Sequence, residues 1–186
     1  AVDHDGHGNG PFWMRMELRV EPGKAVLDFS ASDDQAPGPI NYLVNPAVPR
    51  VMMSMYLLGG DRTLLLNWGS GRAIDEIILR EGSLLQPKWP APLGQRGLTM
   101  MRLLSSTMGM VNAAGGESMA ANCAYVIYIA RGQYANGETF LMSDGLGVGY
   151  GARPYADGID CVYYIAQENF PAEMLELDYP IRVRAY

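Results

Sequence analysis

The feature that most constrains this chain is a run of alternating glycines in its last third. Glycine occupies every second position from Gly145 to Gly151. Alternating glycines give up side-chain packing and cost backbone entropy, so an ordinary core element seldom has this pattern. We therefore predict that this segment permits a close approach of another group to the backbone, either a ligand, a neighbouring strand or another subunit.

Two nucleotide-binding interpretations of the glycine run can be rejected. The register from Gly147 to Ala152 matches the dinucleotide pattern G-x-G-x-x-A, which is meaningful only where it opens a helix after a strand. Here Arg153 and Pro154 follow at once and cannot begin that helix in phase. No glycine-rich segment precedes a P-loop lysine, so we expect no cradle for ATP phosphates on this chain.

The composition favours one domain, or a piece of a larger protein, over a free-standing module. The 186 residues are 48% hydrophobic but only 18% charged, and 12 methionines add adaptable contact surface. The formal net charge of −6 makes nucleic acid an unfavourable partner, because phosphate binding needs clustered basic residues. No apolar window is long enough for a membrane span. Cys123 and Cys161 lie in apolar runs without metal-ligand spacing, which predicts a cytoplasmic, reducing environment.

The predicted fold class is α+β, with β-rich mixed sheets, two longer helices and one short C-terminal helix. The firmest local prediction is a β-hairpin with one buried face, in which Pro22 and Gly23 form a type II turn between alternating runs. The expected regions are a flexible lead-in at 1–12, the hairpin at 13–30, a helix–strand–helix region at 45–116 and a β-rich region at 121–186 that contains the glycine run.

Capping and breaker residues set the expected elements. Helices are predicted from an Asn45 cap to Leu58, from a Thr99 cap to Ala114 with Leu103 and Leu104 inward, and from Pro171 at N1 to Leu177. The remaining expected strands and turn are Leu64–Trp68, Ile74–Leu79, Cys123–Ala130, a turn at Tyr134–Gly137, Glu138–Met142, Ile159–Ala166 and Ile181–Tyr186. The segment Pro87–Pro92 should be extended.

Acidic residues and one arginine near the glycine run are the candidates for chemistry. Acids such as Asp144 and Asp157 could act as general acid and base or hold a divalent cation, although turn chemistry at Asp157-Gly158 and helix stabilisation by Glu173 and Glu176 are the more frequent roles of such residues. Arg153 beside exposed glycine backbone suits a carboxylate or phosphate, or could pair with Asp157. The two histidines, His4 and His7, fit a solvated tail better than a metal site, and they leave no Ser-His-Asp or Cys-His arrangement for a nucleophilic hydrolase.

Several segments together carry a family resemblance. The matching pieces, in order, are LDFSASDDQAPGPIN, LLLNWGSG, EGSLLQPKWPAP, GVGYGARPYADGIDCV and NFPAEMLELDYPIRVRAY. With these the chain resembles the later-middle portion of the B-type subunit of the hydantoinase B/oxoprolinase family, which includes ATP-dependent hydantoinases, 5-oxoprolinase and acetone- and acetophenone-type carboxylases. The family usually has Glu where this sequence has Asp144.

The resemblance implies part of a multi-subunit enzyme. ATP and Mg²⁺ would be used on a partner A-type subunit, which phosphorylates the amide carbonyl, bicarbonate or ketone. The B-type subunit would then complete ring opening of hydantoin, 5-oxoproline or a lactam, or carboxylation of a ketone. A divalent metal such as Mn or Zn would belong to a part of the B-type subunit outside this sequence. A structural or assembly piece without catalytic residues is the remaining alternative.

The site residues expected from this resemblance all come from the C-terminal third. Asp144 and Asp157 would be catalytic, while Arg153 and the glycines Gly147, Gly149 and Gly151 would bind substrate. A surrounding shell would consist of Asn169, Glu173 and Glu176.

Overall fold

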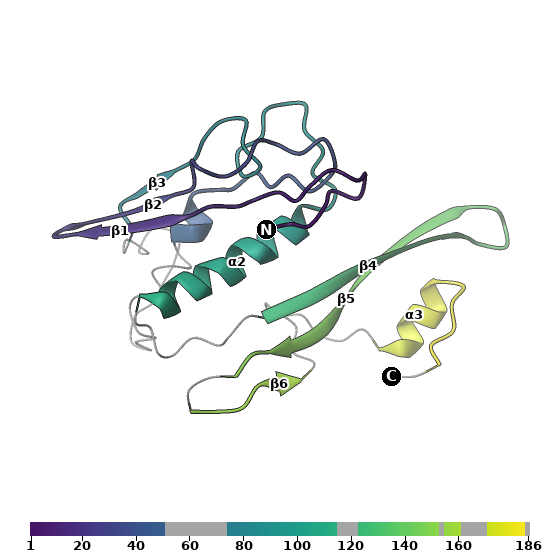
Figure 1. Ribbon diagram of the computed structural model, residues 1–186. Coiled ribbons are helices and arrows are strands. Elements are labelled where there is room, and N and C mark those ends of the chain that lie inside the picture. Colours follow the sequence, from purple (N-terminus) through teal and green to yellow (C-terminus); the bar gives the residue numbers. More distant parts are fainter. Residues whose placement is uncertain (51–73, 115–122, 153–154, 161–170, 185–186) are drawn as a thin grey trace. The chain divides into compact units, whose positions relative to one another are not determined.

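The computed structural model describes residues 1–50, 74–114, 123–152, 155–160 and 171–184 (Figure 1). The chain divides into two compact units, Ala1–Met119 and Ala120–Tyr186. This boundary falls between the predicted helix–strand–helix region and the predicted β-rich region. The observed architecture is mixed, with small sheets and helices, in agreement with the coarse fold class.

The first unit is built on a three-stranded sheet in the order β1-β2-β3. Strands β1 (Glu17–Glu21) and β2 (Lys24–Asp28) are antiparallel, and β3 (Glu76–Ile78) pairs parallel with β2. Gly23 has a φ of 79° at the third position of the turn, a conformation that favours glycine, so the predicted hairpin is confirmed. The expectation of one buried face is wrong for β2, because the successive residues Ala25–Leu27, which alternate between the two faces of the sheet, are all buried.

Helix α2 (Arg96–Ala113) completes the core of the first unit. The main buried cluster consists of Ala25, Leu27, Phe29, Val44, Ile74, Leu85 and Leu103. Leu103 comes from α2, and Leu104 is also buried, as their spacing predicts. The helix begins three residues before the predicted Thr99 cap. Thr99 is not a cap, because its buried hydroxyl donates a hydrogen bond to the carbonyl oxygen of Ile40.

The N-terminal residues pack against this unit instead of forming a free lead-in. Val2 and Phe12 exchange two backbone hydrogen bonds of 2.9 and 2.8 Å. Val2 is only 6% exposed and belongs to a second buried cluster with Ala36, Ile40 and Leu84. The glycine-rich composition alone favours a flexible tail. The free energy gained by burying apolar side chains at both ends of this loop exceeds the entropic cost of ordering its glycines.

Other local predictions for the first unit are supported where the structure describes them. The Asn45 carboxamide oxygen accepts a hydrogen bond of 3.0 Å from the backbone N–H of Ala47, and residues 47–50 are helical. The continuation to Leu58 and the predicted strand Leu64–Trp68 lie outside the described residues. Pro87–Pro92 is neither helix nor strand, as expected.

The second unit contains an antiparallel sheet in the order β4-β5-β6. A turn at residues 134–137 joins β4 (Cys123–Gln133) to β5 (Thr139–Tyr150), and β6 (Ile159–Asp160) pairs with the end of β5. The predicted turn is confirmed, but β5 extends eight residues beyond the predicted end at Met142 and includes most of the glycine run. Of the predicted strand Ile159–Ala166, the described residues are Ile159 and Asp160, which form β6 and are both exposed.

Helix α3 (Ala172–Asp178) follows Pro171, which is the N-cap and not the first helical residue. The helix is held by the hairpin: the Tyr134 hydroxyl donates a 2.9 Å hydrogen bond to the Asp178 carbonyl oxygen, and the Phe140 and Tyr179 rings lie 5.5 Å apart. The predicted last strand is wrong for residues 181–184, which are irregular. The N–H of Val183 donates to the Glu176 carboxylate at 2.8 Å instead of to a strand neighbour.

Candidate functional site

The glycine run forms part of a strand pair whose register shifts within the run, because the adjacent residues Ala124 and Tyr125 of β4 pair with Gly149 and Gly147 of β5. Gly145 pairs with Ile127 and Gly147 pairs with Tyr125, both large residue types, whereas Gly149 pairs with Ala124. At Gly149 the neighbouring strand explains the glycine directly. Its φ is 147°, and a Cβ at this position would lie 3.2 Å from the carbonyl oxygen of Ile159 on β6. One of the predicted close approaches is therefore a strand contact within the unit.

The predicted catalytic residues lie on β5 and in the loop after it. Asp144 is in β5, where its backbone pairs with Tyr128. Asp157 is exposed in the loop before β6, and Gly151 directly follows β5. Arg153 and Asn169 lie outside the described residues.

The predicted surrounding acids lie on α3. Both Glu173 and Glu176 are exposed. Glu173 is in the first helical turn, where a carboxylate favours the positive end of the helix dipole. Glu176 holds the segment after the helix through Val183. Among the described contacts, none joins these two carboxylates to Asp157, so their observed roles are local.

A more elaborate polar arrangement lies in the first unit, at one edge of its sheet. Because β2 and β3 are parallel, their carboxyl ends meet at the same edge, the usual position of functional loops in such sheets. The segment Ser30–Asp34 follows β2, and Arg80 follows β3. Arg15 lies just before β1, which runs antiparallel to β2 and so begins at this edge.

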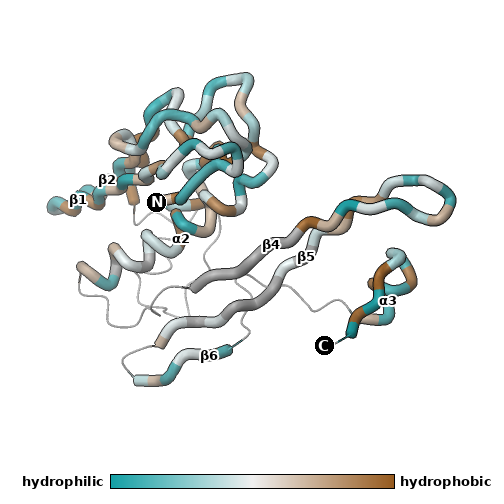
Figure 2. The backbone as a smooth tube through the Cα atoms, turned by 45° about the vertical axis from the view of Figure 1, so that its right-hand side comes forward, coloured by the Kyte–Doolittle hydropathy of each residue, from teal (hydrophilic) through white to brown (hydrophobic). Residues whose placement is uncertain are grey.

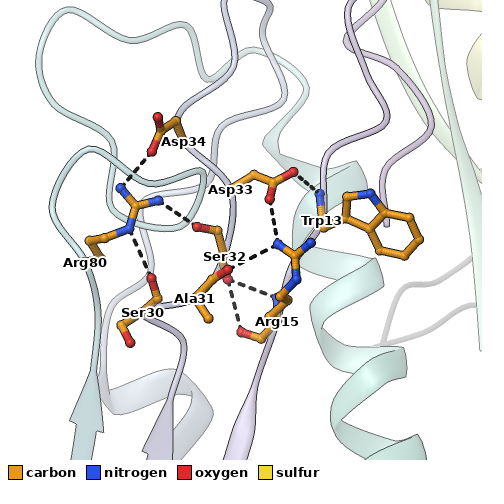
Figure 3. Close-up of polar contacts among 8 residues, drawn as sticks. All are labelled: Trp13, Arg15, Ser30, Ala31, Ser32, Asp33, Asp34 and Arg80. Carbon is orange, nitrogen blue, oxygen red and sulfur yellow. Dashed lines mark hydrogen bonds and ion pairs between the residues drawn. The ribbon is translucent and has the colours of Figure 1, made fainter.

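Two guanidinium groups hold three successive carbonyl groups of this loop (Figure 3). Arg80 donates from Nε to the Ser30 oxygen at 3.0 Å and from Nη2 to the Ser32 oxygen at 2.6 Å. Arg15 donates from Nη1 to the Ala31 oxygen at 3.2 Å. We call Arg15, Arg80 and the carbonyl groups of residues 30–32 the arginine clamp. A planar guanidinium spans two carbonyl groups with donors in a fixed geometry, whereas the donors of an ammonium group share one nitrogen on a flexible stem.

The carboxylates that follow the clamp neutralise its charges. The Asp33 carboxylate accepts a hydrogen bond of 2.7 Å from Arg15 Nη1 and another of 2.8 Å from the backbone N–H of Trp13. The Trp13 hydrogen bond lowers the pKa of Asp33; partial burial opposes this, and Arg15 lowers it further. Asp34 pairs with Arg80 at 2.7 Å. Figure 3 shows both acids turned toward the arginines.

The buried hydroxyl of Ser32 stabilises the clamp through hydrogen bonds to the Arg15 backbone. It accepts from the Arg15 N–H and donates to the Arg15 carbonyl oxygen, both at 3.1 Å. The Arg15 guanidinium also lies 5.9 Å from the centre of the Trp13 ring, within cation–π range. All of these groups are engaged with one another, so the arrangement fixes the shape of a loop at the sheet edge.

The next part of the same loop is fixed by Asn41, which is completely buried. Its carboxamide oxygen accepts a hydrogen bond of 2.7 Å from the Ala36 N–H. Its Nδ2 donates hydrogen bonds to the carbonyl oxygens of Ala36, Gly38 and Pro92, at 2.9, 3.2 and 3.0 Å. These bonds connect the loop to the extended segment before α2. Sequence reasoning did not select this asparagine, although its place in a Pro- and Gly-rich loop is the signal that could have indicated a buried anchor.

A buried carboxylate organises the N-terminal loop. Asp5 is 1% exposed and accepts hydrogen bonds from the Asn9 side chain at 2.8 Å and from the N–H groups of His7 and Asn9 at 2.8 and 3.1 Å. Burial opposes the charge of Asp5, but the hydrogen bonds, with a further one from Gly38, outweigh burial and lower its pKa from 3.8 to about 2. His4 accepts from the Gly6 N–H instead of facing an open site.

Among the described residues, no group of three His, Cys, Asp or Glu side chains could hold a metal ion. In the same part of the chain, no helix has the length and apolar character required to cross a membrane.

Comparison with known proteins covers the whole chain. The family model described as Hydantoinase B/oxoprolinase matches residues 1–186. A protein of Pseudomonas sp. (strain NS671), named as the B-type subunit of a "Putative D-/L-hydantoinase", is 25% identical over 198 residues, covering 100% of this chain and 32% of the relative. The chain therefore spans about a third of the length of that relative. Because the family model matches from the first residue to the last, this chain belongs to the hydantoinase B/oxoprolinase family.

Proposed function

We propose that this chain forms part of the catalytic B-type subunit of an ATP-dependent cyclic-amide hydrolase, which opens the ring of a hydantoin, 5-oxoproline or lactam. The observation that carries the proposal is the family match over residues 1–186. The name of the Pseudomonas relative, which designates one subunit of a D-/L-hydantoinase, favours ring opening over ketone carboxylation and supports an enzyme of several subunits.

In this proposal the glycine strand contributes to the wall of the site in which ring opening is completed. Asp144 and Asp157 act as general acid and base, and Arg153 binds the carboxylate or phosphate of the activated substrate. The backbone of Gly147, Gly149 and Gly151 permits close approach of the substrate, which at Gly149 is limited to the space that β6 leaves open. Asn169, Glu173 and Glu176 orient these groups; the exposure of both glutamates on α3 is compatible with contacts to a partner.

The cofactors of the proposed enzyme belong to other parts of the complex. ATP and Mg²⁺ are used on an A-type subunit, which activates the amide carbonyl. A divalent metal such as Mn or Zn is held by another part of the B-type subunit. When bound, such an ion polarises a carbonyl group or activates a water molecule.

The test is an activity panel on the assembled complex, containing this sequence within its B-type subunit and the A-type subunit. Hydantoin, 5-oxoproline, a lactam and a ketone with bicarbonate are each supplied with ATP and Mg²⁺. We expect ring-opened product coupled to nucleotide hydrolysis. Turnover of the ketone alone would assign the chain to the carboxylases, and no ATP-dependent turnover in an intact complex would leave a structural role.

A second test concerns the anion-binding role. We expect Arg153→Ala to lower kcat/KM at least about tenfold, because a hydrogen bond to a charged group contributes about 1.5–3 kcal/mol. Arg131→Ala, at an exposed position on β4, is the matched control and should leave the kinetics unchanged. Unchanged kinetics for Arg153→Ala would contradict the assignment of this residue.

A further inference from the structure

We propose that Asn136 is a site of spontaneous covalent modification, at which its carboxamide is converted to aspartate and isoaspartate through a cyclic imide formed with the backbone of Gly137. The inference concerns the turn between β4 and β5 and does not depend on the proposed enzymatic activity.

The turn presents the Asn136–Gly137 pair to water. Residues 135–138 are exposed, and the tip of the β4–β5 hairpin is hydrophilic (Figure 2). The turn is closed by hydrogen bonds from the Tyr134 N–H to the Glu138 carbonyl oxygen at 2.8 Å and from the Gly137 N–H to the Tyr134 carbonyl oxygen at 2.9 Å. The reacting atoms are therefore exposed while the flanking strands stay in register.

The nucleophile is the backbone nitrogen of Gly137, whose N–H must release its 2.9 Å hydrogen bond to the Tyr134 carbonyl oxygen before attack, while the Cα side of Gly137 is open. A Cβ placed on Gly137 would have no atom within 4 Å, and the φ of 86° is one that L side chains rarely adopt. Without a Cβ at this position, the carboxamide carbon of Asn136 can approach the following nitrogen with little steric resistance.

Both ends of the Asn136 carboxamide are bound by Glu138. The Glu138 N–H donates to Asn136 Oδ1 at 3.0 Å, and Asn136 Nδ2 donates to Glu138 Oε2 at 2.9 Å. The first bond stabilises negative charge that develops on the carboxamide oxygen during attack. The second places a carboxylate beside the leaving nitrogen, where it can assist proton transfer to the departing amide group.

The reaction balances without an oxidant or reductant. The bond between the Gly137 nitrogen and Asn136 Cγ forms, and the bond between Cγ and Nδ2 breaks. The proton from the Gly137 nitrogen joins the departing NH₂ group, which leaves as ammonia. Water then adds to one of the two imide carbonyl groups and breaks its bond to the ring nitrogen, which gives aspartate or isoaspartate.

The chain contains a second asparagine–glycine pair, Asn9–Gly10, which serves as an internal comparison. Asn9 Nδ2 donates to the buried carboxylate of Asp5 at 2.8 Å, which itself accepts several backbone N–H groups. The space beside Gly10 is filled by the backbone of Asp3 and His4. Asn9 lacks the open approach found at Asn136, so the structure predicts that it reacts more slowly.

The product alters the turn that sets the β4–β5 register. Aspartate replaces the donor group now 2.9 Å from the Glu138 carboxylate with a second negative charge. Isoaspartate adds a methylene group to the backbone inside a turn whose length fixes strand pairing. Both changes weaken the hairpin at the end that contacts α3.

The test is ageing of the full chain at mildly alkaline pH, followed by peptide mapping. Conversion adds about 1 Da to the peptide that contains Asn136, and isoaspartate is detected by enzymatic methyl labelling. We expect Asn136 to react about tenfold faster than Asn9, and Glu138→Gln, which keeps the backbone donor, to slow it about tenfold. Glu21→Gln, in the other hairpin, is the matched control and should leave the rate unchanged.

Two results would overturn the proposal. The first is a folded chain in which Asn136 stays intact while a short peptide of residues 132–141 is converted under the same conditions. The second is Asn9 reacting first. An unchanged rate in Glu138→Gln would refute the assistance by Glu138, and Gly137→Ala, which should suppress imide formation, verifies the identity of the nucleophile.

Discussion

Replacement of Arg80 tests whether the arginine clamp depends on the shape of the guanidinium or on its charge. Arg80 contacts two carbonyl groups, those of Ser30 and Ser32, and one carboxylate, that of Asp34. Lysine keeps the charge but carries one nitrogen on a flexible stem, so it does not reproduce the fixed fork of donors that contacts both carbonyl groups. We therefore compare Arg80→Met, Arg80→Lys and Asp34→Asn in the full chain.

The structure sets the expected sizes of these effects. A hydrogen bond to a charged group contributes about 1.5–3 kcal/mol when shielded from water. The Arg80 side chain is 39% exposed, so solvent reduces this contribution, and we expect Arg80→Met to lower the free energy of unfolding by about 1–2 kcal/mol. Arg80→Lys should cost about 1 kcal/mol. Asp34 is 85% exposed, so Asp34→Asn should cost less than about 0.5 kcal/mol.

The assay is equilibrium unfolding in urea, with hydrogen exchange of the backbone amides of residues 30–36 as a local measure. We expect exchange in this loop to rise in Arg80→Met and Arg80→Lys and to stay unchanged in Asp34→Asn. If lysine supports the wild-type stability and exchange, charge alone is sufficient and the clamp argument fails. It also fails if Asp34→Asn is as damaging as Arg80→Met, because the exposed ion pair would then be the main contribution.

Three further predictions follow from buried or aromatic contacts. Asn41→Asp should destabilise the chain by about 3 kcal/mol, measured by urea unfolding, because a buried carboxylate would face three carbonyl groups without a donor. Because the pKa of Asp5 is lowered, its ionised carboxylate stabilises the fold fully above about pH 3.8, and this contribution to the free energy of unfolding is lost as the pH falls toward about 2. Asp5→Asn should remove this contribution to the pH dependence of unfolding, measured by acid titration. Phe140→Ala removes the ring contacts with Tyr134 and Tyr179, so amide exchange in α3 should increase, with a loss of about 1–3 kcal/mol.

Local sequence rules predict the turns and much of the secondary structure of this chain. Pro22-Gly23 and the turn at residues 134–137 require backbone conformations that few residues adopt, and both occur where expected. The start of α2 was predicted too late because Thr99 fits two roles. A threonine can cap a helix or bond a distant carbonyl group from within it, and only the packing of Ile40 against the helix decides between them.

Long-range pairing explains why the arginine clamp was not predicted. Arg15 and Arg80 are separated by most of the first unit, and their meeting point depends on the parallel pairing of β2 with β3. Neither arginine belongs to a recognisable local pattern. By contrast, the glycine run is visible in the sequence, but its periodicity of two is also that of a strand, so the pattern cannot separate a binding loop from a sheet.

The glycines of β5 themselves allow this distinction to be tested. Gly149 has a positive φ and lies against β6, so Gly149→Ala should destabilise the second unit whether or not a ligand binds. Gly147 lies opposite Tyr125 in the register with β4, and the described pairing of β6 with β5 covers only Gly149 and Tyr150.

If Gly147 serves the approach of a substrate, Gly147→Ala in the assembled enzyme should lower kcat/KM with little change in the melting temperature, whereas Gly149→Ala should lower both. Thermal unfolding and steady-state kinetics on the same preparations separate the two effects. Equal losses of stability in both variants, with kinetics per folded molecule unchanged, would show that the glycine run serves strand packing alone, and the substrate-binding assignment of Gly147 would be withdrawn.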